Sequence, residues 1–304
     1  MERPGRQAAA LELRAAALVR EVIPALAEAG VRAIVLKGPA IRQWLYPPSE
    51  PRAAVDLDIL VAPSDFERTE DILRDLGFAA EMTGWSTEAH GLSRPDGGAI
   101  DLHRSLPTVG AEPETAWKLL SANTAPLLVA GIETECLAIP ARALHLSLHA
   151  AQHPEQRRPE EDLERGLAIL DIPTWREAAT LAQELRATAP FAAGLRRTER
   201  GSEVAAALGL PASGGSGSTL GLRGPVVTLA GISRAGGWRE RLRLAAWHAA
   251  PPPAYLRSWS RLARHGRLGL ALAYLLRPFV LVSRLLPAGR DYLRARRALG
   301  RARK

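Results

Sequence analysis

Apolar and polar positions follow two different patterns along the chain, and each pattern predicts its own kind of structure. As far as residue 140, stretches with apolar residues at helical spacing alternate with short runs rich in β-branched residues. The predicted helices are residues 6–29, 40–46 and 64–76, and the predicted extended segments are 31–36, 55–61, 85–93, 99–103, 126–129 and 133–139. This part of the sequence therefore predicts an α/β (α+β) fold.

After Pro140 the strand pattern stops and the sequence predicts helices only. Residues 141–153, 162–170 and 175–188 are amphipathic at helical spacing. The run Ser-Gly-Gly-Ser-Gly-Ser at 213–218 is typical of a flexible linker or a long surface loop. We therefore expect four parts: a core with its N-terminal helix, 1–140; a helical region, 141–212; a flexible loop or linker, 213–236; and a basic amphipathic helical segment, 237–304.

Charge is distributed unevenly along the chain. Residues 234–304 contain 17 basic and 2 acidic residues, so the preceding part carries a net charge of −7 within a total of +8. Such a segment can bind an anionic lipid surface, bind nucleic acid through phosphate contacts, or pack against the acidic part of the chain. No known nucleic-acid-binding motif is present, so nucleic acid is not favoured as a partner. The most apolar stretch, Leu268 to Leu276, is nine residues long and too short to span a bilayer.

Two features of the sequence bear on where the protein is found. The single cysteine, Cys136, excludes an internal disulfide and fits a reducing compartment. The N-terminal residues lack the pattern of an export signal, because Glu12 and Arg14 interrupt the alanine-rich stretch. The sequence predicts a cytoplasmic protein, and residues 237–304 leave association with a membrane surface open.

Two predicted strands carry carboxylates among apolar residues. In residues 55–61, Asp56 and Asp58 are expected to share one face, because successive side chains of a strand alternate. In residues 99–103, Asp101 and His103 likewise share a face. Carboxylates at this spacing repel one another unless a cation lies between them, and hard oxygen ligands suit Mg2+. These acids predict a metal site; the alternative is that they simply face solvent at strand ends.

Taken in order along the chain, these motifs resemble those of a known family. The matching residues are Leu36-Lys37-Gly38, Arg52, Asp56-Leu57-Asp58-Ile59-Leu60-Val61 and Ile100-Asp101-Leu102-His103. The pattern is similar to that of the bacterial uncharacterised nucleotidyltransferase family of the DNA polymerase β-like nucleotidyltransferase superfamily. The resemblance covers residues 31–105 and extends more loosely to about residue 200. It implies a polymerase β-like core with a mixed sheet, followed by a C-terminal helical region.

The resemblance also implies an activity. Enzymes of this superfamily transfer a nucleoside monophosphate from a nucleoside triphosphate (NTP) to a hydroxyl group, with release of pyrophosphate and with the help of two Mg2+ or Mn2+ ions. By this resemblance Asp56, Asp58 and Asp101 hold the metal ions, and Asp101 also accepts the proton of the acceptor hydroxyl. The acceptor is a small molecule, a sugar or a peptide, and the sequence does not choose among them.

Further residues are candidates for binding the nucleotide. Gly38 lets the backbone approach phosphate closely, the helix beginning near Pro39 offers amide donors, and Lys37 adds a positive charge. The turn has no serine, whereas the wider superfamily has Gly-Ser or Gly-Gly-Ser there, although Lys-Gly is usual in the narrower family. Arg52 is either an anion ligand or a solvated loop residue.

Histidines form another candidate group. His145, His149 and His153 are four residues apart and therefore lie on one face of the predicted helix. Their spacing can bind zinc, but no acid or cysteine beside them completes such a site. The remaining interpretations are contact with the nucleotide or acceptor, for which His149 is the candidate, and ordinary packing. His103, on the acidic face of its strand, is expected to support the metal site.

Two other functions remain open at this point. The same carboxylates suit phosphoryl transfer to a peptide or small molecule, in place of nucleotidyl transfer. Alternatively, the chain is a non-catalytic nucleotide-binding partner protein at a membrane surface. The three clustered acids argue against the second alternative, because clustered carboxylates without a metal cost stability.

Overall fold

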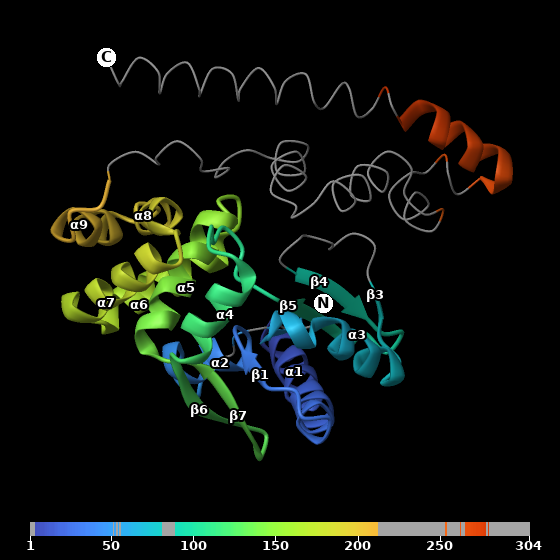
Figure 1. Ribbon diagram of the computed structural model, residues 1–304, viewed down its shortest axis with the longest axis horizontal. Helices are drawn as coiled ribbons and strands as arrows, with labels where there is room; N and C mark the ends of the chain where they lie inside the picture. Colours follow the sequence, from blue (N-terminus) through green and yellow to red (C-terminus); the bar gives the residue numbers. More distant parts are fainter. Residues whose placement is uncertain are drawn as a thin grey trace. The chain divides into compact units, whose positions relative to one another are not determined.

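The computed structural model describes residues 4–50, 52, 54, 56–80, 89–211, 253, 262, 265–277 and 279. The chain divides into two compact units, Met1–Ser218 and Thr219–Lys304. All seven strands and the nine helices named below belong to the first unit (Figure 1). In the second unit, residues 266–277 are helical. The predicted linker and most of the basic segment lie outside the described residues, and the finer division into four parts stays a prediction.

The first unit combines helices and strands in the order that the sequence predicts. Its helices are α1 (Pro4–Glu28), α2 (Pro39–Leu45), α3 (Phe66–Asp75, after the 3-10 turn η1, Pro63–Asp65), α4 (Pro113–Ser121), α5 (Ile139–Gln152), α6 (Arg157–Ile169), α7 (Ile172–Glu184), α8 (Thr188–Leu195) and α9 (Glu199–Ala207). Its strands are β1 (Ala33–Val35), β2 (Leu57–Val61), β3 (Ala79–Ala80), β4 (Ala89–Ser93), β5 (Ala99–His103), β6 (Thr124–Val129) and β7 (Ile132–Leu137). The prediction of an α/β fold followed by a helical region is confirmed.

Several bounds differ from those predicted. Strand β2 begins at Leu57, so Asp56 lies in a bend before it. The helix predicted to reach residue 188 ends at Glu184, and a separate helix, α8, begins at Thr188. The structure also adds α4, α9 and the short strand β3, for which the sequence analysis had no counterpart. Helix α4 starts with Pro113 in its first turn, where a missing amide hydrogen costs nothing.

The seven strands form one mixed sheet in the order β3-β4-β5-β2-β1-β7-β6. Strand β2 pairs in parallel with β5, and β1 pairs in parallel with β7, whereas the other neighbours are antiparallel. The register of β2 and β5 sets Asp58 directly beside Asp101 and Leu60 beside His103. Two strands far apart in the sequence thus bring their polar residues to one place.

Each face of the sheet is covered by a different set of helices. Residues such as Ile59 and Leu102 belong to a core shared with α1 and α3. The opposite face, which includes Leu60, belongs to a core shared with α2, α4 and the helices α5 to α9. Because side chains alternate along β2, Asp58 lies on the same face as Leu60 and therefore faces the second set of helices.

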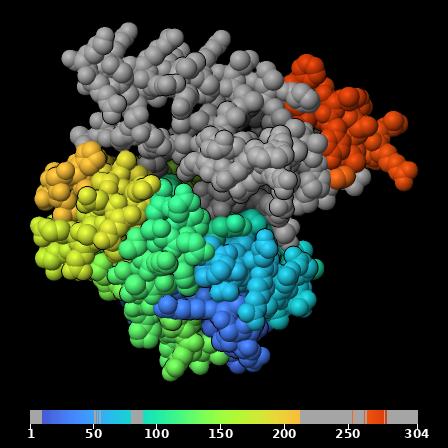
Figure 2. All heavy atoms as spheres, in the orientation of Figure 1, coloured from blue at the N-terminus to red at the C-terminus, as the bar shows by residue number. Residues whose placement is uncertain are grey.

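Helix α5 is the centre of the helical region. It packs against α6, α7 and α8 on one side and against β7 on the other. Figure 1 shows α6 to α9 grouped around α5, away from β3 and β4. In the space-filling view, the yellow surface of these helices continues without a break into the green surface of the preceding elements (Figure 2). The helical region therefore completes one face of the sheet. Among the described residues, no helix has both the length and the apolar character needed to cross a lipid bilayer.

Candidate active site

Two neighbouring parallel strands bring the predicted acids together. Asp58 in β2 and Asp101 in β5 are direct register partners, and His103 lies two residues beyond Asp101 on the same face. Asp58, Asp101 and His103 each offer a metal-ligand atom, and these atoms all lie within 4.8 Å of one another. Carboxylate oxygens with an imidazole nitrogen are a donor set that divalent cations accept.

A lysine already supplies positive charge to this group. Asp58 is only 1% exposed, and its Oδ1 lies 2.6 Å from Nζ of Lys37 and 3.3 Å from Nε2 of His103. Burial raises the pKa of the Asp58 carboxyl, but Lys37 and His103 outweigh it and hold this pKa below its usual range. Burial lowers the pKa of Lys37, but the charges of the neighbouring acids, Asp58 first, outweigh it and raise the pKa. Asp58 is therefore a carboxylate and Lys37 an ammonium over the physiological pH range.

Asp56 is close to the same charges but is held differently. It lies in the bend before β2 and is not among the three residues whose ligand atoms cluster. Burial, and then the negative charge of Asp58, raise the pKa of its carboxyl to about 6. Asp101 adds to this repulsion. A bound divalent cation would relieve the repulsion that raises the pKa of Asp56, so the residues present fit a metal ion.

The turn after β1 is fixed by close backbone packing. Gly38 has φ +59°, a conformation that residues with a side chain rarely adopt. A Cβ atom at this position would also lie 3.3 Å from Cβ of Ala54, in the segment that leads to Asp56. The glycine thus lets the Lys37 turn and the acidic segment approach each other. Helix α2 begins directly after the turn, at Pro39.

Arg52 is not a solvated loop residue, because it is buried and paired with an acid. It is 6% exposed, and its guanidinium donates to both carboxylate oxygens of Asp162, at 3.1 and 2.6 Å. The hydroxyl of Tyr46 donates to the same carboxylate at 2.5 Å. Asp162 lies in α6 and is completely buried. This ion pair fastens the loop before β2 to the helical region, and it accounts for the charge of Arg52.

Neither Asp162 nor Tyr46 was predicted as a site residue from the sequence. The missing information is tertiary, because Arg52 and Asp162 are 110 residues apart. One signal was available: an acid in the apolar stripe of an amphipathic helix requires a buried partner.

The three histidines of α5 face the same region as Lys37. Burial, and then the positive charge of Lys37, lower the pKa of His145 to about 3. The same two causes, in the same order, lower the pKa of His149 well below its usual value. His153, at the end of the helix, is half-buried, and its pKa is lowered for the same reasons. All three rings are therefore neutral imidazoles in the metal-free protein.

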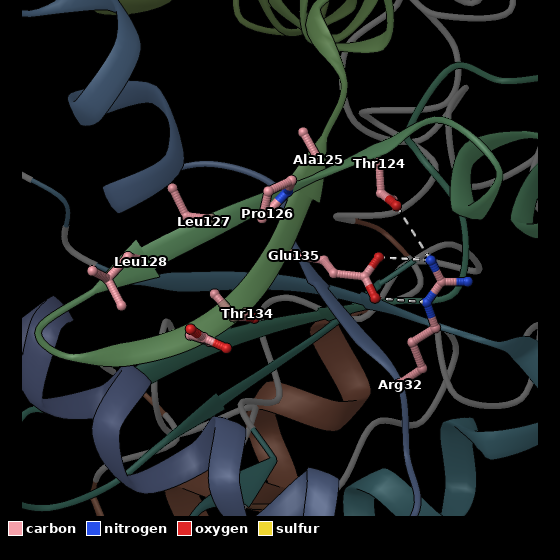
Figure 3. A pocket seen from close by; sticks show the side chains of 9 residues that line it. Arg32, Thr124, Ala125, Pro126, Leu127, Leu128, Thr134 and Glu135 are labelled. Carbon is pink, nitrogen blue, oxygen red and sulfur yellow. Dashed lines mark hydrogen bonds and ion pairs between the residues drawn. The ribbon is translucent and has the colours of Figure 1, made fainter.

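A hollow of about 610 Å3 lies elsewhere, on the hairpin of β6 and β7. Figure 3 shows Arg32 reaching across it to Glu135 and Thr124, at 2.6 and 3.2 Å. Arg32 comes just before β1, whereas Lys37 follows the other end of that strand. None of the candidate residues lines this hollow.

The comparison with protein families identifies the family of this chain. The model of the family described as "Uncharacterised nucleotidyltransferase" matches residues 1–200. No curated protein matches the chain. Among solved structures, the lincosamide antibiotic adenylyltransferase LnuA, with lincomycin bound, is 15% identical with a TM-score of 0.39, over 50% of this chain and 96% of its own. The antibiotic-resistance factor ANT(2'')-Ia is 16% identical with a TM-score of 0.42, over 56% and 90%.

A further structure, an antigenic nucleotidyltransferase-like protein from Paracoccidioides brasiliensis, is 16% identical with a TM-score of 0.36, over 58% of this chain and 86% of its own. The family match covers about two thirds of the chain and includes every candidate site residue. The resemblance inferred from the motifs is confirmed. The chain is an enzyme that belongs to the family of uncharacterised nucleotidyltransferases.

Proposed function

We propose that the protein transfers a nucleoside monophosphate from an NTP to a hydroxyl of an acceptor molecule at the Asp58–Asp101 site. One observation carries this proposal: in a chain of a nucleotidyltransferase family, two acids are direct neighbours on parallel strands, and His103 and Lys37 lie beside them. The acceptor is a small molecule, a sugar or a peptide.

Asp58 and Asp101 are the residues that would hold a divalent cation, with His103 or Asp56 beside them. When bound, Mg2+ or Mn2+ would neutralise the phosphate charge and stabilise the charge that develops in the transfer. Lys37 would then be free to turn its ammonium from Asp58 towards phosphate oxygens.

In the proposed transfer, one bond to the α-phosphorus forms, one breaks, and one proton moves to the protein. The acceptor oxygen forms a bond to the α-phosphorus, and the bond from this phosphorus to pyrophosphate breaks. The proton of the acceptor hydroxyl goes to a carboxylate, for which Asp101 is the candidate. Asp101 is the less buried of the two paired acids, so it is better placed to meet a group that arrives from solvent.

Labelled nucleotides test this proposal. The wild type and Asp58→Ala are incubated with Mg2+, a cell extract as the source of acceptor, and ATP labelled at the α or the γ position. We expect α-label on the product and pyrophosphate release from the wild type only. Label from the γ position would instead establish phosphoryl transfer. Metal-independent binding of NTPs, or none, would favour a non-catalytic partner protein.

A second proposal concerns the C-terminal unit. We propose that it binds an anionic lipid surface, while the enzyme stays cytoplasmic. Leu268, Leu272 and Leu275 in the helical residues 266–277 are at least half exposed, and their spacing sets them on one side of the helix. Residues 234–304 carry a net charge of +15, which complements anionic lipid headgroups.

Vesicle sedimentation of the full chain tests the membrane proposal. We expect the wild type to pellet with vesicles of phosphatidylcholine and phosphatidylserine, and not with phosphatidylcholine alone. Leu272→Glu should reduce pelleting severalfold, because it introduces a charge into the apolar side. Equal pelleting of the protein with both vesicle types, or no pelleting with either type, would overturn the proposal.

A further inference from the structure

The two cations predicted to bind phosphate are both committed to carboxylates. Arg52 is bonded to Asp162 through two hydrogen bonds, and Lys37 lies 2.6 Å from Asp58. A triphosphate chain carries only hydrogen-bond acceptors, so it requires donors on the protein or a metal ion. The polar groups that face Lys37 from the helical region are the histidines of α5.

These histidines form a continuous row. The ring centroids of His145 and His149 are 6.2 Å apart, and those of His149 and His153 are 5.0 Å apart. The first ring is 7% exposed and makes a hydrogen bond with the backbone of Leu36, directly before the Lys37 turn. The row therefore begins beside the acidic strands and leads towards the end of α5. Along the helix axis, the rise from His145 to His153 is about 12 Å.

In this row, the ring of His149 has a nitrogen that can donate a hydrogen bond to a ligand. Its Nδ1 is enclosed by the protein and has no hydrogen-bond partner, whereas Nε2 is not enclosed. An enclosed nitrogen without a partner is less costly as a lone pair than as an N–H group. In the neutral ring the proton then resides on Nε2, because one nitrogen is the donor and the other the acceptor. His149 consequently presents an N–H donor to accessible space.

We infer that the histidine row of α5 is a binding surface for the phosphate chain of the nucleotide, and that His149 Nε2 donates a hydrogen bond to a phosphate oxygen. This inference rests on the proposed function, which supplies the ligand class. Of the charged side chains that act on these rings, Lys37 acts most strongly on all three, and the acids Asp58 and Glu155 act more weakly.

Binding of tripolyphosphate tests the inference without depending on turnover. Calorimetry with Mg2+ and tripolyphosphate compares the wild-type full chain with His149→Phe, which keeps a ring but removes the donor. It also includes His149→Gln, whose amide nitrogen occupies nearly the position of Nε2. We expect the Phe variant to bind about tenfold more weakly or worse, and the Gln variant to retain most of the affinity. Gln152→Ala, at an exposed position of the same helix, should bind as the wild type does.

The outcomes separate this inference from the proposed function. Equal tripolyphosphate binding by the wild type and a folded His149→Phe variant, checked by its thermal midpoint, would overturn the inference alone. Equal loss in the Phe and Gln variants would also overturn it, because the loss would then be one of packing. Binding of tripolyphosphate that depends on His149, with no transfer of α-label, would leave the inference standing and overturn the proposed function. No binding of tripolyphosphate by the wild type would overturn the inference.

Discussion

Two buried ion pairs join a cation to a carboxylate in this protein, and they are completed to very different degrees. Asp162 is fully buried and accepts hydrogen bonds from Nε and one terminal nitrogen of Arg52 and from the hydroxyl of Tyr46. Asp58 is also buried, but it shares a single ammonium, that of Lys37, with the further acids Asp56 and Asp101.

We call Arg52–Asp162 the closed pair, because its role is structural. We call Lys37–Asp58 the open pair, because another cation can take the place of the ammonium. A planar guanidinium matches a carboxylate with two parallel bonds, which fix both groups in one geometry. An ammonium is a point charge on a flexible stem, so a divalent cation can replace it. Around Asp58, moreover, Nδ1 of His103 and Nδ1 of His149 are enclosed without partners. Incomplete bonding marks the place where a ligand is expected.

The largest effect is expected from a substitution that breaks the open pair of Lys37 and Asp58. Asp58→Asn keeps the shape of the side chain but removes its charge, so nucleotidyl transfer should fall about a thousandfold. Pyrophosphate release under saturating Mg2+ is the measurement. Glu135→Gln, in the hairpin ion pair with Arg32, is the control and should stay within about twofold of the wild type. A variant at Asp58 that retains a tenth of the activity would contradict the assignment.

The same substitution in the closed pair should act on stability. Asp162→Asn leaves the buried guanidinium of Arg52 without a counter-charge, which should lower the unfolding free energy by about 4 kcal/mol. Urea denaturation of the full chain measures this loss. Asp58→Asn should cost less, because Asp56 and Asp101 remain near Lys37. Equal losses at the two sites would remove the distinction between the pairs.

The third prediction concerns pH. Because the pKa of Asp56 is raised to about 6 in the folded protein, the folded state holds this proton more tightly than the unfolded state does. Through this group, the free energy of unfolding should fall as pH rises from about 4 to 6. Asp56→Asn removes this effect. The free energy of unfolding of the variant, relative to that of the wild type, should therefore increase by roughly 2 kcal/mol as pH rises over that range.

This measurement requires metal-free protein and a comparison of the two chains. The buried neutral rings of His145 and His149 act in the opposite direction, because the unfolded chain takes up their protons as pH falls below about 6.5. Both chains share this contribution, so it cancels in the difference. A difference that does not change between pH 4 and 6.5, with a chelator present, would contradict the raised pKa.

The smallest expected effect tests whether Lys37 and a metal compete. Without nucleotide, Lys37→Met should bind Mn2+ several times more tightly than the wild type, because no ammonium opposes the cation at Asp58. Calorimetric titration measures the affinity. Lys118→Met, at an exposed position of α4, is the matched control. Weaker binding by the Lys37 variant would show that the two cations do not exclude each other.

Local patterns were sufficient for the parts of the fold that depend on spacing. Strand alternation predicted that Asp101 and His103 share a face, and four-residue spacing predicted the histidine row on α5. Apart from the short strand β3, the order of helices and strands up to residue 103 also followed from the hydrophobic pattern. Sequence could not supply the register that sets Asp58 beside Asp101, since pairing of two strands is a tertiary property.

Other parts depended on contacts between distant segments. The segment before β2 lies close to the Gly38 turn, and nothing in the local pattern of residues 55–61 predicts the bend at Asp56. The role of Arg52 was open because its partner lies in another helix. In both cases the local sequence indicated a charged residue of interest, but it could not show which residues surround it in the fold.

The parallel pairing of β1 with β7 also affects how the chain is made. Val35 is synthesised about 100 residues before its partner Cys136. At usual rates of synthesis, the delay between the two residues is about 5 to 20 s. During this interval β1 can pair with β2, but its other edge has no partner strand and helix α5 does not yet cover the acids. An open strand edge is a template for aggregation. We therefore expect the nascent chain to depend on chaperones until residue 152 has emerged.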